Sequence, residues 1–193
     1  MTLKVVFMGT PQFAVPALKK ICESEMDIVT VYSQPPRKSN RGMNIEKSPV
    51  HKFADDNNLN IRTPSKLDDD WEYFKSLKFD LAIVVAYGQI ISKNFLEIPE
   101  HGFLNIHASI LPKWRGAAPI QRSIMEQDTF TGISIMQIEE QLDAGPVLIR
   151  QEIELNENST AGQVEQRLSE IGADKILEAI HLIEKKEAVY IPQ

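Results

Sequence analysis

The sequence predicts an α/β fold in which a mostly parallel sheet carries helices on both faces. Short apolar segments with the length of strands alternate along the chain with amphipathic segments of helical spacing. The segment "LAIVVA", residues 81–86, is apolar throughout, which is typical of a central strand covered on both sides. No internal repeat, low-complexity segment or change of composition divides the chain, so residues 1–193 are expected to form a single domain.

The individual elements follow from local patterns. The longest helical segment covers residues 159–186 and has a capping box at Thr160 and Gln163, although Gly172 is expected to interrupt it. The strand candidates are residues 3–9, 27–33, 79–87, 103–107, 132–138 and 146–153, and two further helical candidates are residues 48–57 and 117–127.

Composition limits the classes of protein. Cys22 is the only cysteine, which excludes an internal disulfide and a structural zinc site built from several thiolates, and the reducing cytoplasm is the expected compartment. No apolar run approaches the roughly 20 residues that span a bilayer, so no membrane partner is expected. The net charge of -6 argues against coating nucleic acid with the whole surface, but it leaves room for a local basic patch.

The turn "MGTPQF" follows the first strand, where dinucleotide-binding folds carry a glycine-rich turn. Thr10 could cap a helix with Pro11 at its first position, but the second and third glycines of GxGxxG are missing after Gly9. Those glycines let the backbone approach a pyrophosphate, so nucleotide binding of that kind is not favoured. The sequence also lacks G-x-x-x-x-G-K-[ST], G-x-S-x-G and H-E-x-x-H, so the enzyme classes that carry these motifs have no support.

The stretch "FLNIHASILPKWRG", residues 103–116, places two polar side chains in an apolar strand. Asn105 and His107 are two residues apart and therefore share a face at the end of that strand, where ligands bind in open α/β sheets. An amide N–H and an imidazole could together stabilise the oxyanion of an acyl-transfer intermediate. The alternative is a hydrogen-bonded polar pair that merely ends the strand, and the residues alone leave both readings open.

Asp143, in "QLDAGPV", could supply a carboxylate to such a site, because it follows the strand at residues 132–138. Asp is also a favoured first residue of a turn, which is the simpler explanation. Spacing in the sequence cannot show whether Asp143 meets His107.

A long irregular segment covers residues 33–48, "SQPPRKSNRGMNIEKS". It carries four basic residues and one acidic residue. Such a segment is either a mobile, solvated loop or a functional loop. The functional hypothesis is that its basic side chains bind an anionic partner such as a phosphate backbone.

These segments resemble a known family. "NIHASILPKWRGAAPIQRSI" resembles the signature of the folate-dependent formyltransferases, and "LDAGPVL" is similar to their Asp-containing loop. "VFMGTPQFAVPAL" and "SQPPRKSNRGMNIEKSPV" resemble the members that act on initiator methionyl-tRNA. The resemblance covers essentially the whole chain. It implies a Rossmann-like domain that transfers a formyl group from 10-formyltetrahydrofolate to the amino group of methionine on the initiator tRNA, with no metal.

The resemblance also implies roles for single residues. Asn105 and protonated His107 would stabilise the oxyanion, while Asp143 would tune His107 and assist removal of the amine proton. The implied folate contacts are Ser109, Ile110, Leu111, Pro112, Gln89 and Ile90, and the implied tRNA contacts are Arg41 and Gly42.

The family normally continues into a basic, β-rich carboxy-terminal domain that also holds tRNA, and the sequence has no counterpart of it after Gln193. We therefore expect a monomeric catalytic domain over residues 1–193 with intact folate chemistry and weak tRNA binding.

Two alternatives remain. A sugar-nucleotide or glycinamide ribonucleotide N-formyltransferase would share the Asn-x-His and Asp residues, but the "SQPPRKSNRG" segment is not expected there, and the glycinamide enzyme would begin with a Gly-Ser-Gly-like turn. The second alternative, from a different class, is a Rossmann-like module that binds folate without catalysis.

Overall fold

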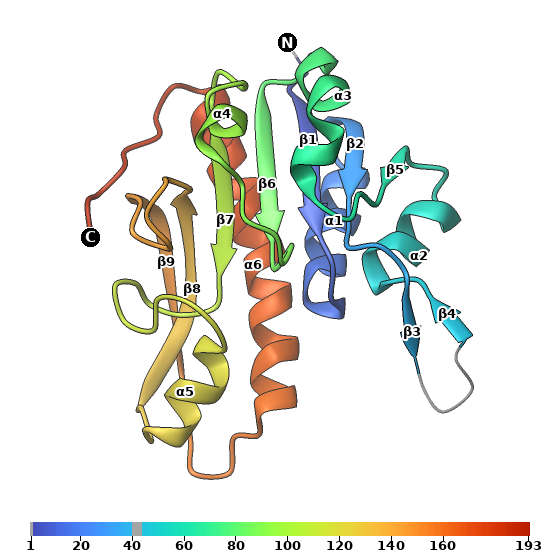
Figure 1. Cartoon of the computed structure of the whole chain (residues 1–193). Coiled ribbons are helices and arrows are strands. Elements are labelled where there is room, and N and C mark those ends of the chain that lie inside the picture. The colour runs from blue at the N-terminus through green and yellow to red at the C-terminus, as the bar shows by residue number, and fades with distance from the viewer. Residues whose placement is uncertain (1, 40–43) are drawn as a thin grey trace. The chain divides into compact units, whose positions relative to one another are not determined.

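A computed structural model describes residues 2–39 and 44–193 and divides into two compact units, Met1–Gly102 and Phe103–Gln193 (Figure 1). The first unit contains the strands β1 (Lys4–Gly9), β2 (Asp27–Tyr32), β3 (Arg37–Ser39), β4 (Asn44–Glu46), β5 (Ile61–Arg62) and β6 (Leu81–Val85). Its helices are α1 (Val15–Cys22), α2 (Pro49–Asp56), α3 (Trp71–Ser76) and α4 (Lys93–Leu96), with 3-10 helices η1 (Gln12–Ala14) and η2 (Leu67–Asp70). The second unit contains β7 (Phe103–His107), α5 (Pro119–Met125), β8 (Phe130–Gln137), β9 (Val147–Glu154) and α6 (Ala161–Glu184).

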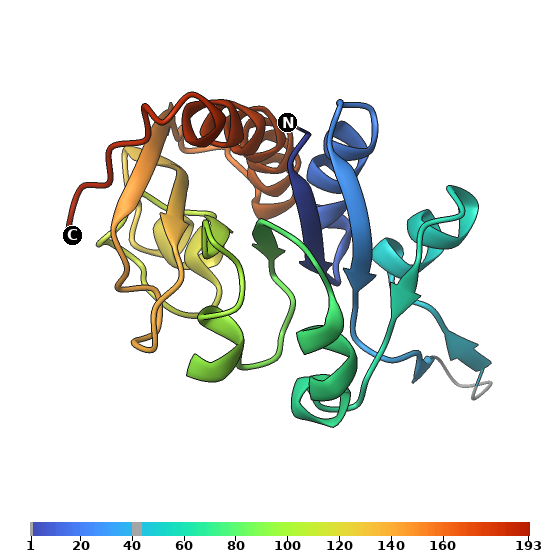
Figure 2. The same ribbon diagram turned by 90° about the horizontal axis from the view of Figure 1, so that it is seen from above.

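The first unit is built on a parallel sheet with the strand order β5-β2-β1-β6. The side chains of β1 from Val5 to Met8 have no exposed surface, because the strand is covered on both faces. Figure 2 shows α1 and α3 on opposite sides of β1 and β2. The parallel strands and the helices on both faces agree with the sequence prediction. Within the described residues, no helix is long and apolar enough to cross a membrane.

Thr10 does not cap a helix, and the sequence prediction was wrong on this point. The 3-10 turn η1 intervenes, so α1 begins only at Val15. The hydroxyl of Thr10 instead donates to the carbonyl oxygen of Tyr87 at 2.8 Å and accepts from the backbone N–H of Gln34 at 3.3 Å. Since these three residues follow β1, β6 and β2, one hydroxyl links the carboxyl ends of three parallel strands.

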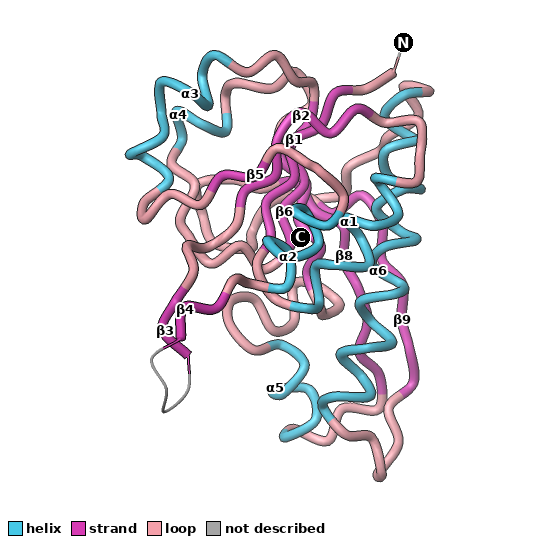
Figure 3. Tube along the Cα trace, turned by 90° about the vertical axis from the view of Figure 1, so that its right-hand side faces the viewer, coloured by secondary structure: helices cyan, strands magenta, loops and turns pink. Residues whose placement is uncertain are grey.

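The basic segment 33–48 is less irregular than predicted. β3 and β4 pair in an antiparallel ribbon in which Arg37 lies opposite Glu46. Figure 3 shows this ribbon projecting from the first unit, at the end where β1, β2 and β6 terminate. The predicted tRNA contacts Arg41 and Gly42 lie outside the described residues.

The second unit is an antiparallel sheet, β7-β8-β9, with α6 packed on β8 and β9. In the first ladder Asn105 pairs with Met136 and His107 pairs with Ser134. The buried side chains of α6 recur at helical spacing and include Leu168, Ile176 and Ile180.

Helix α6 runs without a break through Gly172, contrary to the predicted interruption. Its amino end has the predicted capping box of Thr160 and Gln163. A Cβ atom at Gly172 would lie 2.7 Å from Cγ2 of Ile106 in β7. Glycine is therefore present because the helix backbone approaches the strand closely, and not because the helix ends there.

We expect Gly172→Ala to lower the free energy of unfolding by about 1–2 kcal/mol. The helix gains up to about 1 kcal/mol in propensity, but overpacking against a rigid β-branched side chain costs typically 1–3 kcal/mol. The matched control is Gly162→Ala in the same helix, where the new methyl group would meet nothing within 4 Å and should stabilise. Urea unfolding measures both, and equal stabilisation by the two substitutions would contradict the close contact.

A carboxylate is buried between β2, β5 and η2 in the first unit. Asp70 accepts hydrogen bonds from the Tyr32 hydroxyl at 2.8 Å and from Nε of Arg62 at 2.5 Å, and Nη2 of Arg62 binds its other oxygen. Burial alone would raise the pKa of Asp70. The hydrogen bonds from Arg62 and Tyr32 outweigh it, so the pKa of this carboxyl lies below its usual value.

Because its pKa is lowered in the folded protein, Asp70 should stabilise the fold above the unfolded value near pH 4, and this contribution should disappear as the pH falls below it. We expect Asp70→Asn to destabilise the protein at pH 7 by about 1–3 kcal/mol, since the neutral amide cannot satisfy Arg62. The substitution should also flatten the dependence of stability on pH between pH 5 and pH 2. Unfolding by urea at several pH values tests this, with exposed Asp69→Asn as control; identical pH dependence in wild type and Asp70→Asn would refute it.

Candidate functional site

The carboxyl end of β7 positions two of the predicted catalytic residues. Asn105 is half-buried, and the His107 side chain is buried at 6% exposure. Both lie on one face of the strand, because side chains alternate, and Ile106 between them points to α6. The apolar face thus anchors the strand while the polar face carries the amide and the imidazole.

Both ring nitrogens of His107 face oxygen atoms. Nε2 lies 3.0 Å from the backbone carbonyl oxygen of Trp114, and Nδ1 lies 3.7 Å from Oδ2 of Asp143. A carbonyl oxygen only accepts, so the first contact is a hydrogen bond when Nε2 carries the hydrogen. The imidazolium is the form that can donate toward both oxygens. Among residues 2–39 and 44–193, no three side chains of His, Cys, Asp or Glu are grouped as a metal site requires.

Asp143 is held in place through its backbone and its side chain. It has a left-handed backbone with φ of 47°, which Asp tolerates better than most residues. Oδ2 accepts from the backbone N–H of Gly116 at 2.8 Å. The side-chain amide of Gln193 donates to the carbonyl oxygens of Asp143 at 3.0 Å and of Gly145 at 2.6 Å. These bonds fix the Asp143 carboxylate beside Nδ1 of His107. Spacing in the sequence alone could not show that the two residues meet.

The predicted folate segment 109–112 is tied to β8. The hydroxyl of Ser134 donates to the carbonyl oxygen of Ser109 at 2.7 Å and accepts from the N–H of Leu111 at 3.1 Å. The side chains of Ser109 and Leu111 are buried, and the Ser109 hydroxyl is bonded to the Lys113 carbonyl at 2.6 Å. Of the four predicted contacts, Ile110 and Pro112 thus keep side chains accessible from outside.

The other predicted folate contacts, Gln89 and Ile90, belong to the first unit. The side-chain amide of Gln89 accepts from the N–H of Leu67 at 2.6 Å and donates to the carbonyl of Pro64 at 3.0 Å. Ile90 is 91% exposed, which is unusual for a large apolar side chain. The hydrogen bonds of the Gln89 side chain thus stabilise the backbone at Pro64 and Leu67. Of the two predicted contacts, Ile90 is the one whose side chain is accessible to a ligand.

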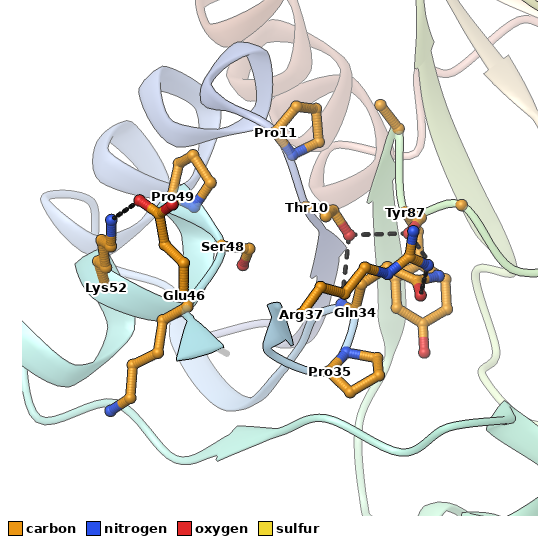
Figure 4. A pocket seen from close by; sticks show the side chains of 13 residues that line it. Thr10, Pro11, Gln34, Pro35, Arg37, Glu46, Ser48, Pro49, Lys52 and Tyr87 are labelled. Carbon is orange, nitrogen blue, oxygen red and sulfur yellow. Dashed lines mark hydrogen bonds and ion pairs between the residues drawn. The ribbon is translucent and has the colours of Figure 1, made fainter. Parts of the chain in front are cut away.

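A cavity of about 670 Å³ opens in the first unit at the carboxyl ends of β1, β2 and β6 (Figure 4). This is the edge at which open α/β sheets bind their ligands. Its lining residues are Thr10, Pro11, Gln34, Pro35, Arg37, Glu46, Lys47, Ser48, Pro49, Lys52, Ala86, Tyr87 and Gly88.

Among the described residues, the lining carries three cations and one carboxylate. The guanidinium of Arg37 donates to Oε1 of Gln34 at 3.0 Å. Lys52 lies 2.8 Å from Glu46, and Lys47 lies 2.5 Å from Asp55 outside the lining. The cavity is thus basic in a chain whose net charge is -6.

Sequence reasoning missed the groups that support these side chains. Trp114 contributes a backbone carbonyl, which no residue-type pattern identifies. Ser134 is, like Thr131, a buried polar residue of the largely apolar strand β8, and that departure was a usable signal. Gln193 gave none, because it lies 50 residues from Asp143 in the sequence.

The family model described as "Formyl transferase" matches residues 3–180. The methionyl-tRNA formyltransferase of Pelagibacter ubique (strain HTCC1062) is 52% identical over 95% of this chain and 60% of its own length. The same-named protein of Parvibaculum lavamentivorans (strain DS-1 / DSM 13023 / NCIMB 13966) is 48% identical over 99% of this chain and 62% of its own length. The chain thus spans about three fifths of these curated relatives.

Solved structures have the same fold. A phosphoribosylglycinamide formyltransferase from Anaplasma phagocytophilum has a TM-score of 0.79 and 18% identity, covering 96% of this chain and 89% of its own. An N-formyltransferase from Helicobacter canadensis has a TM-score of 0.77 and 20% identity, covering 100% of this chain and 68% of its own. These similarities confirm the predicted α/β, Rossmann-like fold. Together with the family match, they lead to one conclusion: this chain belongs to the formyl transferase family.

Proposed function

We propose that this chain transfers the formyl group of 10-formyltetrahydrofolate to the amino group of initiator methionyl-tRNA, and that residues 1–193 form its catalytic domain. The family match and the names of the relatives support the reaction class and the acceptor. The observation that carries the proposal is the setting of His107, between the Asp143 carboxylate and the Trp114 carbonyl, with Asn105 on the same face of β7.

In this reaction the methionine nitrogen attacks the formyl carbon. A C–N bond forms, the formyl oxygen becomes an oxyanion, and the bond to N10 of the folate then breaks as the amine proton is transferred to N10. Asn105 and the imidazolium of His107 donate to the developing oxyanion. The imidazole donor is Nδ1–H, because Nε2 is bonded to the Trp114 carbonyl, whereas Nδ1 lies 3.7 Å from Asp143 and makes no hydrogen bond to it. Both side chains are already fixed on β7, so little reorganisation is needed during the reaction.

Asp143 faces Nδ1 of His107, where its charge can tune the imidazole, and assists removal of the amine proton. At 3.7 Å, Nδ1 and Oδ2 are too far apart for a short hydrogen bond but close enough for electrostatic attraction. A water molecule beside this pair would be placed to carry the proton from the amine.

The segment Ser109–Pro112 is the proposed lining of the folate site in the second unit. Its backbone is fixed by Ser134, so Ile110 and Pro112 present apolar surface to the pterin-bearing ligand. Gln89 and Ile90 remain predicted contacts of the same co-substrate.

The cavity of the first unit is a proposed contact for the phosphate groups of the acceptor end. Its three cations lie on or beside the β3–β4 ribbon, whose segment resembles the tRNA-contacting insertion of the family. Cationic side chains at a phosphate backbone position the nucleic acid without reading its sequence. Arg41 and Gly42 remain predicted tRNA contacts.

Replacement of His107 tests the catalytic proposal directly. We expect His107→Ala to lower kcat for formyl transfer to initiator methionyl-tRNA by about 100- to 10,000-fold, with binding of the folate co-substrate unchanged. His181→Ala, on the exposed surface of α6, is the matched control. Equal turnover by wild type and His107→Ala would contradict the assigned role. Folate binding without turnover in the wild type would point to a different amine acceptor, or to a part of the longer relatives that this chain does not span.

Replacement of Arg37 tests the cavity. The guanidinium is exposed, so Arg37→Ala should fold normally and reduce the slope of log affinity for tRNA against log salt concentration by about 1. Lys19→Ala removes the same charge from an exposed site in α1 that does not line the cavity, and its slope should match the wild type. Equal slopes for wild type, Arg37→Ala and Lys19→Ala would exclude a phosphate contact at Arg37.

A further inference from the structure

Asp128 lies in the turn after α5 and has no part in the roles proposed above. Its backbone N–H donates to the carbonyl oxygen of Ser123 at 2.9 Å, which fixes the turn. Its side chain is only 9% exposed, and its two carboxylate oxygens bind neighbouring residues of one loop. Oδ2 accepts from the indole N–H of Trp114 at 2.7 Å, and Oδ1 lies 2.5 Å from Nζ of Lys113.

The backbone of Trp114 is in an unusual conformation. Its φ of 63° is rare for a bulky residue and persists only where surrounding contacts enforce it. This conformation directs the Trp114 carbonyl oxygen to Nε2 of His107, at 3.0 Å. The preceding carbonyl, of Lys113, is held by the hydroxyl of Ser109. At its side-chain end, Trp114 is held by the directional hydrogen bond from its indole to Asp128, and Nζ of Lys113 lies 5.1 Å from the centroid of the ring.

We infer that Asp128 is a positioning residue for His107, acting through the indole and the backbone carbonyl of Trp114. The sequence of contacts is carboxylate to indole N–H, indole to its own strained backbone, and backbone carbonyl to the imidazole. Asp128 touches neither His107 nor any proposed substrate contact. Its kinetic consequence rests on the proposed function, whereas its effect on the imidazole does not.

The two partners of Asp128 should differ in importance. Lys113 is 57% exposed, and an exposed cation contributes little through an ion pair. The indole has one hydrogen with a fixed direction and is half-buried. Burial alone would raise the pKa of Asp128, but the bonds from Lys113 and Trp114 outweigh it and hold the pKa below its usual value. The carboxylate is therefore ionised near neutral pH and remains an acceptor for the indole.

The test is the nitrogen NMR spectrum of His107 in protein labelled with ¹⁵N-histidine, assigned by the loss of its signals in His107→Ala. We expect Asp128→Ala and Trp114→Phe to change the Nε2 signal in the same direction, because both release the Trp114 carbonyl. Asp128→Asn should restore a signal close to wild type, since its amide oxygen can still accept the indole hydrogen. Lys113→Met removes the ion pair and the cation–π contact of Nζ with the Trp114 ring, 5.1 Å from its centroid, but keeps the indole hydrogen bond, so its signal should stay close to the wild type.

Kinetics of formyl transfer in the same variants provide the second measurement. Asp128→Ala and Trp114→Phe should lower kcat by about 10- to 100-fold with KM for the folate co-substrate little changed, and Asp128→Asn should recover most of the loss. An unaltered His107 spectrum in folded Asp128→Ala, or an equal change in Lys113→Met, would overturn the inference. If Asp128→Ala does not fold, the His107 spectrum and kcat of Trp114→Phe test the inference in its place. If the wild type does not transfer the formyl group but Asp128→Ala and Trp114→Phe still change the His107 spectrum, the proposed function is refuted and the positioning role remains supported.

Discussion

The candidate site depends on one imidazole that meets an oxygen acceptor at each ring nitrogen. With the Trp114 carbonyl at Nε2 and the Asp143 carboxylate facing Nδ1, a rotated ring would place C–H groups against these oxygens. The orientation of His107 is therefore set by its neighbours. The strand beneath it is equally fixed, because Ile106 packs against α6 at Gly172, where the helix has no side chain. Rigid packing on one face of β7 thus makes a preorganised polar group possible on the other.

Much of the fold could be predicted, because buried strands leave apolar runs that residue type alone reveals. All six predicted strands are present, and β7 has the predicted bounds. Strand direction could not be read from such runs. The connection between β7 and β8 contains helix α5 and looks like a parallel crossover, yet the two strands are antiparallel. The predicted helix cap at Thr10 was wrong for a related reason. The same hydroxyl can either cap a helix or link the ends of neighbouring strands, and only the tertiary structure decides which of the two it does.

The candidate site was predictable only where side-chain chemistry itself marks the residue. Asn105, His107 and Asp143 could be selected because polar groups at strand ends and turns are chemically distinctive. The groups that orient them could not, since the Trp114 carbonyl is backbone and its direction depends on a φ of 63°. Trp114 and Asp143 both have a left-handed backbone conformation, which the residue type does not predict at either position. Strained conformations of this kind are common at functional sites.

The phosphate contact proposed for the cavity of the first unit requires a local basic surface in a chain whose net charge is -6. Two of its cations, Lys47 and Lys52, are already paired with carboxylates, which would argue against such a site if those pairs were strong. Both lysine side chains are about half exposed, at 49% and 53%, and pairs of this kind contribute little to stability. A phosphate could therefore replace the carboxylate at either lysine with little loss. Arg37 donates to the neutral amide of Gln34 and keeps its full charge for the ligand. The net charge of the chain is therefore a poor guide to this surface. Its lysines are in weak ion pairs, and a phosphate, which carries more charge than a carboxylate, could take the place of the carboxylate partner.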